Sequence, residues 1–484
     1  MRTPAAVLAR TGALSLIFVW LCVAPTLLAV ELSVDCSRTN GIIRPLHGVN
    51  LGPLCYRGMV DLSAYHRELG VPFTRLHDVV WVNAEAVDIH TIFPDFRNDA
   101  ARADNYDFRQ TDDYVQSIVS VGSQIVYRLG ESIEHSARKY HVHPPSDPEK
   151  WAAICVGIIR HYNDGWADGF HHRIKYWEIW NEPDVRPAMW TGTDEQYFRL
   201  YEITAKAIKA RFPEVKIGGP GLGHSGDFAG DRFTPTAFLT NFLAHCRQSG
   251  TPLDFYSWHR YTKNPADFAR WAHAVRRVLD DSGFLQTESH LNEWNYLPNG
   301  DWGPLTKDGA GVRRENWFAE LSGPAGAAFS AWTLISLQEA PVDVVNYYTG
   351  EIQGFGLFNF HGVPNKSFYA FKAFKWLLDT PIRLTTGGET SNHIAICAGT
   401  NRERSAAAVL LSNFNSADDK VLLTVRHVPW AGLVLCQTYV VDAAHNLTKV
   451  RETTSPGGDC SVTVELKAPS IALVKLLKAG AETK

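Results

Sequence analysis

Between residues 41 and 379, short apolar runs alternate with longer segments of helical periodicity. Eight of the short runs have the length and the β-branched or aromatic content of buried strands: 42–50, 73–79, 124–132, 174–183, 215–220, 253–261, 286–294 and 328–336. Among the helical segments is 193–212, where apolar residues recur every three or four positions and Thr193 and Gln196 fit a capping box. Eight strands that alternate with helices predict an α/β fold, a (β/α)₈ TIM barrel. A doubly wound open sheet is the alternative, but no glycine-rich phosphate loop follows the first run.

The pattern changes after Pro381, where strand-like runs are separated by turn residues: "HIAICAG", "SAAAVLLSNF", "KVLLTVRHV", "GLVLCQTYVVD", "CSVTVELKA" and "SIALVKLLK". These runs predict a C-terminal β-sandwich over residues 381–484. We expect a strand at 31–40 to join this sandwich and the barrel to span 41–380. The two ends of the chain then meet on one accessory domain.

The first thirty residues have the pattern of a targeting segment. Arg2 and Arg10 precede an apolar stretch that ends in small residues near Ala29, which is typical of a secretory signal peptide. The alternative is an uncleaved membrane anchor, which is disfavoured because Pro25 and Thr26 interrupt its end. No later segment approaches a membrane span in length and hydrophobicity. We therefore expect a secreted or periplasmic protein with no membrane span in the mature chain.

The composition excludes some classes of partner. The chain has 47 basic and 51 acidic residues and a net charge of −4, so its charge gives no reason to expect nucleic acid or an anionic membrane as a partner. The 15 tryptophans and 17 tyrosines fit either core packing or stacking platforms for sugar rings. The 19 histidines form no H-E-x-x-H motif and accompany no cysteine cluster, so we expect neither a metal nor a cofactor. The oligomeric state and the pairing of the seven cysteines after Cys22 stay open.

Two glutamates lie at the ends of expected strands. Asn181 and Glu182 end the fourth run, and Pro183 removes the next backbone donor, which leaves both polar side chains at the rim. Glu293 lies at the end of the seventh run. Catalytic groups of such barrels lie at the carboxyl ends of strands, and two carboxyl groups across one pocket are what glycoside hydrolysis requires. Taken alone, either glutamate would more often be a surface or salt-bridged residue.

Two neighbouring carboxylates need a different explanation. Glu178 shares a strand face with Glu182 but lies four residues deeper, so we interpret it as a paired structural residue. Glu288 and Glu293 are five positions apart, and strict alternation would put them on opposite faces of the strand.

Several motifs occur in the order found in one enzyme family: "KYWEIWNEPD", "EQYFRLYEITAKAIKARFPEVKIGGPG", "TRLHDV", "LDFYSWHRYT", "LNEWN", "AWT" and "GFGLFNFHGVPNKSFYAFKAF". By these motifs the barrel resembles glycoside hydrolase family 39, which holds β-xylosidases and α-L-iduronidases. Asn-Glu-Pro alone marks only a broad clan of retaining barrel enzymes, whereas the ordered set is more specific.

The resemblance implies a role for each matching residue. Glu182 would be the general acid/base, Glu293 the nucleophile and Arg75 the group that orients it. The substrate-binding residues that it implies are Asn181, His77, His259, Tyr261, Trp332 (a platform on the eighth strand) and Glu339. Without the barrel placement, the histidines would be interpreted as satisfied core residues and Tyr261 as simple packing.

The departures from the family bear on the substrate. α-L-Iduronidases carry a lysine where this chain has Tyr261 and use it with an arginine to hold the uronate carboxylate, and residues 350–360 offer no arginine. This favours a neutral sugar, and hence a retaining, β-xylosidase-like enzyme that acts on an oligosaccharide or polysaccharide. His77-Asp78 and Asp88-Ile-His90 differ from the usual β-xylosidase pattern and are candidates for a different pocket rim. The alternatives are an α-L-iduronidase-like glycosaminoglycan hydrolase and a non-catalytic carbohydrate-binding barrel.

Overall fold

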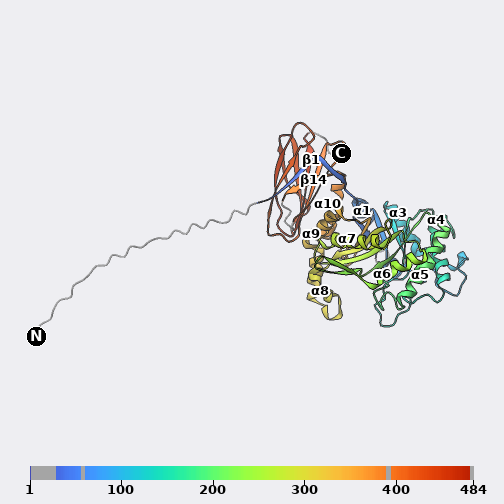
Figure 1. Ribbon diagram of the computed structural model, residues 1–484. Coiled ribbons are helices and arrows are strands. Elements are labelled where there is room, and N and C mark those ends of the chain that lie inside the picture. The colour runs from blue at the N-terminus through green and yellow to red at the C-terminus, as the bar shows by residue number, and fades with distance from the viewer. Residues whose placement is uncertain (2–28, 56–59, 389–393, 480–484) are drawn as a thin grey trace.

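The computed structural model describes residues 1, 29–55, 60–388 and 394–479. Nearly all of the expected signal peptide, 1–30, lies outside these residues. The described chain forms a barrel ringed by helices and a sheet domain that packs against one side of it (Figure 1). Within the described ranges no helix combines the length and the hydrophobicity that crossing a bilayer requires.

Eight parallel strands close into a barrel in chain order: β2 (Gly48–Asn50), β5 (Phe73–Leu76), β6 (Gln124–Leu129), β7 (Tyr176–Ile179), β8 (Lys216–Leu222), β11 (Phe255–Thr262), β12 (Glu288–Tyr296) and β13 (Val344–Tyr348). The helices are α1 (Ser63–Leu69), α2 (Ile89–Ile92), α3 (Arg109–Ser120), α4 (Pro148–Asp164), α5 (Asp194–Arg211), α6 (Ala237–Ser249), α7 (Asp267–Asp281), α8 (Val312–Ser322), α9 (Pro324–Ser336) and α10 (Lys366–Leu378). The predicted TIM barrel is confirmed, and α5 begins with the expected Thr193–Gln196 capping box.

Short elements decorate the loops: β3 (Leu54–Cys55), β4 (Val60–Asp61), β9 (Gly226–Ala229), β10 (Arg232–Pro235), η1 (Ala103–Asn105), η2 (Pro298–Gly300), η3 (Gly303–Leu305), η4 (Lys307–Gly309) and η5 (Leu337–Glu339).

The eighth strand is not where the sequence pattern placed it. Residues 328–336 belong to helix α9, which begins at Pro324, and a proline at the first helical position is a common start signal. The helix is apolar around most of its circumference because it packs between the barrel and the sheet domain, in contact with α10, β15 and β16. The strand that closes the barrel is β13, and the expectation for 328–336 was therefore wrong.

The accessory domain is one nine-stranded sheet in the order β19-β18-β21-β16-β15-β14-β1-β17-β20. Its strands are β1 (Val30–Ile42), β14 (Ile382–Gly388), β15 (Ile394–Thr400), β16 (Ala406–Asn413), β17 (Lys420–Arg426), β18 (Val434–Val441), β19 (Asn446–Ser455), β20 (Cys460–Glu465) and β21 (Ser470–Lys478). Buried residues from both halves of the sheet, such as Val409 and Val462, share one core, so the sheet folds over as a sandwich. β1 lies inside the sheet, antiparallel to β14 and parallel to β17.

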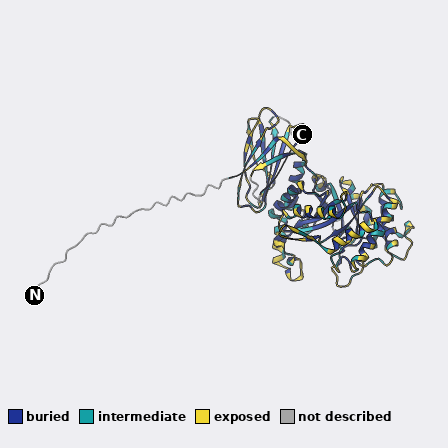
Figure 2. Cartoon of the chain, viewed as in Figure 1, coloured by how far each residue is buried: buried dark blue, intermediate teal, exposed yellow. Residues whose placement is uncertain are grey.

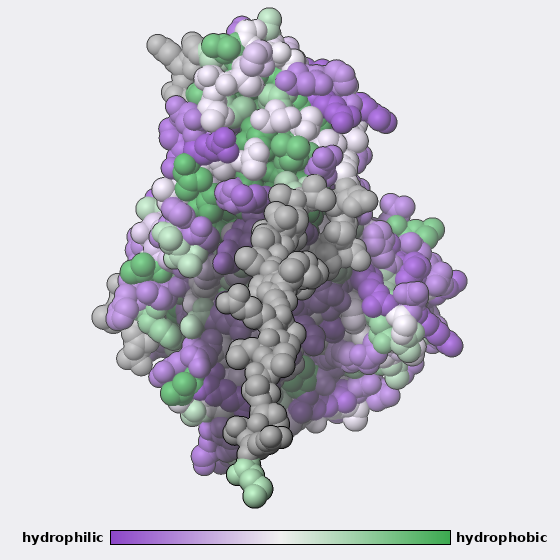
Figure 3. Space-filling model, turned by 90° about the vertical axis from the view of Figure 1, so that its left-hand side faces the viewer, coloured by the Kyte–Doolittle hydropathy of each residue, from purple (hydrophilic) through white to green (hydrophobic). Residues whose placement is uncertain are grey.

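Burial divides the barrel into a closed end and an open end. Phe73, Val126, Tyr176, Phe255 and Val344, near the amino ends of their strands, pack together and fill the lower interior. The strands are largely buried, and the surrounding helices expose their outer faces (Figure 2). On the face shown in Figure 3, hydrophilic residues cover much of the barrel. The carboxyl ends of the strands are therefore where polar side chains can gather around a pocket.

Candidate active site

The chain changes direction sharply after β7. The strand ends at Ile179, earlier than the expected end at Pro183, because Trp180 takes a φ of 71° and Glu182 a φ of 46°. Such values are uncommon for residues other than glycine and are concentrated at functional sites. The turn brings Asn181 into the barrel, fully buried, and leaves the Glu182 side chain 17% exposed.

A β-bulge aims Glu293 into the same space. In β12, Leu291 pairs with Trp258 and Glu293 pairs with His259, so Asn292 is the extra residue. Asn292 donates a hydrogen bond to Glu178 inside the barrel, and Glu293 also faces inward. The alternation argument that separated Glu288 from Glu293 was therefore wrong.

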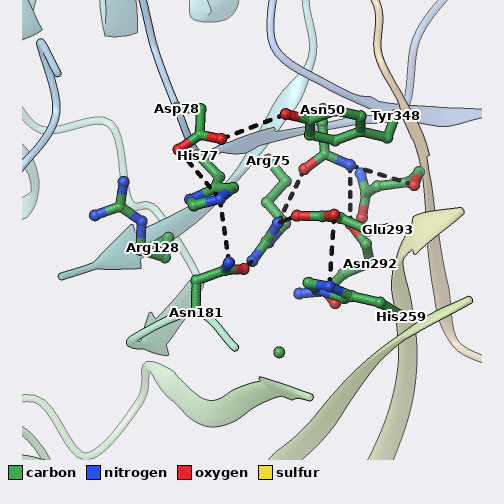
Figure 4. Close-up of polar contacts among 12 residues, drawn as sticks. Asn50, Arg75, His77, Asp78, Arg128, Asn181, His259, Asn292, Glu293 and Tyr348 are labelled. Carbon is green, nitrogen blue, oxygen red and sulfur yellow. Dashed lines mark hydrogen bonds and ion pairs between the residues drawn. The ribbon is translucent and has the colours of Figure 1, made fainter. Parts of the chain in front are cut away.

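Arg75 is the centre of the polar network in Figure 4. This fully buried side chain contacts Glu178 at 2.7 Å and Glu293 at 2.8 Å, and it donates to Asn181 Oδ1 at 2.6 Å. Burial favours the neutral form of Glu178, but the arginine charge outweighs it and lowers the pKa of that carboxyl. Arg75 thus holds two carboxylates, the structural Glu178 and the candidate nucleophile Glu293, at fixed positions. It also donates to Asn50 Oδ1 at 3.1 Å.

The two candidate catalytic carboxyl groups have different surroundings. Glu293 accepts from Arg75 and from the Tyr261 hydroxyl, 2.8 Å each, whereas Glu182 contacts His259 Nδ1 at 2.8 Å. Burial raises the pKa of Glu182 to about 7. Burial also raises the pKa of Glu293, but His259, Arg75 and Tyr261 oppose that rise. Glu182 is therefore suited to hold a proton and Glu293 to carry a charge.

The remaining expected binding residues divide into two groups. His77 lies in the site, where Asn181 Nδ2 contacts its Nε2 at 3.1 Å and burial pushes its pKa well below the ordinary value. From β11, His259 contacts both Glu182 and Glu293, and the Tyr261 hydroxyl donates to Glu293. The structure thus brings together all of the expected site residues except Trp332 and Glu339.

Trp332 and Glu339 do not belong to this pocket. Trp332 is on α9, half-buried against the core outside the strands, and was assigned to the site through the misplaced eighth strand. The Glu339 side chain is 68% exposed and pairs with Arg383 at 2.6 Å and with Asn40 at 3.1 Å, at the junction with the sheet domain. Both assignments are corrected.

The same error concealed two residues at the end of the true eighth strand. Tyr348 ends β13, and its pKa is raised by burial and by the nearby carboxylates of Asp78 and Glu293. Glu351 follows, 8% exposed, and burial raises its pKa to about 8; it accepts one hydrogen bond, from Gln353 at 2.8 Å. The run "DVVNYY", followed by a Thr-Gly turn, was the signal that could have identified this strand.

Two groups of side chains are close enough to share a cation. In the described chain, the ligand atoms of Glu182, His259 and Glu293 all lie within 4.8 Å of one another, and those of Glu85, Asp88 and His90 do so at the rim. Carboxylate and imidazole are common ligands for zinc. Asp88 already accepts from Arg128 at 2.7 Å, which makes the rim group the less available of the two.

A TIM barrel whose rim carries two facing carboxyl groups, one with a raised pKa and one held by arginine, defines a glycosidase, an enzyme that hydrolyses O-glycosyl bonds. A family model described as "Glycosyl hydrolases family 39" matches residues 56–429, and the chain belongs to this family.

Two β-xylosidases and one solved glucosidase structure are similar to this chain, in agreement with the family assignment. The chain is 26% identical over 395 residues to a β-xylosidase of Caldicellulosiruptor saccharolyticus, covering 73% of this chain and 71% of that protein. It is 27% identical over 264 residues to a β-xylosidase of Geobacillus stearothermophilus, where the match covers 50% of this chain and about half (49%) of the relative. A solved glucosidase structure from Croceicoccus marinus aligns with a TM-score of 0.78 at 25% identity, covering 94% of this chain and 100% of that one.

Proposed function

We propose that this protein is a retaining, β-xylosidase-like glycosidase that removes a neutral sugar from an oligosaccharide or polysaccharide. The observation that carries the proposal is the separation of Glu182 and Glu293, whose nearest oxygen atoms lie within 4.8 Å. Retaining glycosidases keep their carboxyl groups about 5–5.5 Å apart, whereas inverting enzymes need about 6.5–9.5 Å to admit a water molecule.

In the proposed double displacement, Glu293 attacks the anomeric carbon while Glu182 protonates the leaving oxygen. Arg75 and Tyr261 hold the nucleophile by one oxygen each, and they orient the attack. Glu182 then takes a proton from water, and the resulting hydroxide releases the sugar from Glu293. The pKa of about 7 for Glu182 suits both proton transfers near neutral pH.

A neutral sugar is favoured because Arg75 and Arg128 already have carboxylate partners. Arg75 is shared among Glu178, Glu293 and Asn181, and Arg128 pairs with Asp88. A uronate carboxylate usually requires a free arginine with bidentate geometry. The β-xylosidase names of the relatives support the same choice.

Hydrolysis of a panel of aryl glycosides tests the proposal. The panel holds β-D-xyloside, β-D-glucoside, β-D-galactoside, α-L-arabinofuranoside and α-L-iduronide. We expect cleavage of at least one neutral glycoside with retention at the anomeric carbon. NMR of the first sugar released gives its anomeric configuration. Cleavage of the iduronide alone would favour the iduronidase-like alternative, and inversion would overturn the mechanism.

Two variants separate the roles of the glutamates. Glu293→Ala should abolish turnover, and azide should restore it with a glycosyl azide of inverted configuration as the product. Glu182→Ala should slow natural substrates far more than aryl glycosides with good leaving groups, which need little acid assistance. Glu315→Gln, an exposed change on α8, is the matched control. Sugar binding without hydrolysis, unchanged by Glu293→Gln, would instead favour a non-catalytic binding barrel.

The proposal includes secretion or export to a periplasm, which is supported by the charged and apolar pattern of the first thirty residues. Amino-terminal sequencing of the protein recovered from each cell fraction tests it. Export and cleavage near residue 30 are expected, and an intact amino terminus in the cytoplasm would contradict the proposal.

A further inference from the structure

Asp78 occupies a left-handed backbone position, which is uncommon for residues other than glycine, although aspartate tolerates it better than most. It lies two residues after β5, at the carboxyl end of the barrel, with a φ of 55°. A residue other than glycine in this region costs on the order of 1 kcal/mol or more, and such residues concentrate at active sites and ligand clamps. Glycine would take this backbone shape freely, so the side chain is the reason to look for a function.

Two other elements hold the Asp78 carboxyl group in place. The backbone N–H of Ile133, in the loop after β6, donates to Oδ1 at 2.9 Å. The Tyr348 hydroxyl, at the end of β13, contacts Oδ2 at 3.4 Å, as Figure 4 shows. The carboxyl group is therefore fixed from both sides and has little freedom to turn away from the pocket.

This carboxyl group has no cationic partner among the described residues. Its one ion-pair contact is His77 at 3.3 Å, and burial keeps that imidazole neutral by lowering its pKa. Arg128 is near, but its Nη2 forms an ion pair with Asp88. Burial raises the pKa of Asp78 to about 6, although the hydrogen bond from Ile133 and the charge of Arg128 oppose the rise. The side chain remains 21% exposed, so a ligand can reach it.

The position of Asp78 indicates which part of a substrate it would meet. Figure 4 shows Asp78 and His259 on opposite sides of Arg75. His259 contacts Glu182, the group proposed to protonate the leaving oxygen. Asp78 itself contacts His77 and Tyr348, which lie beside Asn181 and Glu293, so it is placed to meet hydroxyl groups of the sugar ring. A fixed carboxylate accepts charge-assisted hydrogen bonds from hydroxyls, which are stronger than those between neutral groups.

We propose that Asp78 is a specificity-determining residue whose carboxylate accepts hydrogen bonds from hydroxyl groups of a neutral glycone. The inference rests on the proposed function and deepens it. It also gives a reason for excluding uronates, because a substrate carboxylate beside Asp78 would meet a like charge. The contact is direct, so losing it should affect only substrates that carry the recognised hydroxyl.

The experiment combines variants with altered substrates. Asp78→Asn keeps a carbonyl oxygen for the Ile133 N–H, and Asp78→Gly removes the backbone strain, so neither change should prevent folding. Each variant is assayed on the preferred aryl glycoside and on its single-deoxy analogues. We expect kcat/KM to fall about 10- to 100-fold on the parent glycoside. On the analogue that lacks the recognised hydroxyl, the same substitution should change kcat/KM less than about 3-fold.

Glu315→Gln is the control, because Glu315 is acidic and exposed on α8 and, among the described residues, belongs to no group at the pocket. It should leave the ranking of the deoxy substrates unchanged. An equal loss on every analogue would overturn the inference and give Asp78 a structural role only. Activity of the unchanged protein on the parent glycoside reports on the proposed function separately, so the two can fail independently.

Discussion

Glu351 should make the protein less stable as the pH rises, and the structure sets the size of the effect. Burial raises the pKa of this carboxyl to about 8, against 4.5 for an ordinary glutamate. The folded protein then binds more protons than the unfolded chain between these values, so the free energy of unfolding falls with increasing pH. Integrated from about pH 5 to about pH 8, the loss from this group alone is about 3–4 kcal/mol.

The perturbation is Glu351→Gln, which keeps an oxygen for the hydrogen bond from Gln353 and removes the titration. Urea unfolding at about pH 5 and about pH 8 gives the free energy of unfolding for each protein. The variant should lose about 3–4 kcal/mol less than the unchanged protein between the two conditions. Glu315→Gln, exposed on α8, should leave the difference unaltered. Equal losses in Glu351→Gln and the unchanged protein would refute the reasoning.

Three further results are expected. With a glycoside of poor leaving ability, kcat/KM should fall above about pH 7 as Glu182 loses its proton, and Glu182→Gln should lack this limb; a limb that persists would assign the titration to another group. Arg75→Met should cost about 3–5 kcal/mol in urea unfolding, because it strands two buried carboxylates, whereas Arg97→Met on the surface should cost less than about 1 kcal/mol. Zinc ions should inhibit reversibly through Glu182, His259 and Glu293, and inhibition that a chelator fails to reverse would contradict this site.

Much of the barrel could be predicted because its strands and helices have clear periodicities. The strand-end positions of Asn181, Glu182 and Glu293 also followed from the sequence, since parallel strands carry their functional groups at one end. The eighth strand could not be separated from α9 by hydrophobicity alone, because α9 is buried between two domains. Trp332 and Glu339 were assigned to the site through that error, and Tyr348 was missed through it.

The finer geometry depends on contacts that no local pattern encodes. The bulge at Asn292 reverses the alternation in β12, and a single extra residue has no signature in the sequence. The positive φ of Glu182 was likewise invisible, because glutamate is not a residue that favours it. The contacts of Arg75 with Asn50, Glu178 and Glu293, on three different strands, could be seen only once the barrel was closed.

The strand β1, near the beginning of the chain, completes the sheet domain formed by the end of the chain. It lies between β14 and β17, so removing Val30–Ile42 would divide the nine-stranded sheet into a six-stranded and a two-stranded part. During synthesis β1 leaves the ribosome before the barrel and must wait for strands that follow the barrel. The accessory domain can therefore close only after nearly the whole chain has been made, and an excised fragment 381–484 should assemble only when a peptide spanning Val30–Ile42 is supplied.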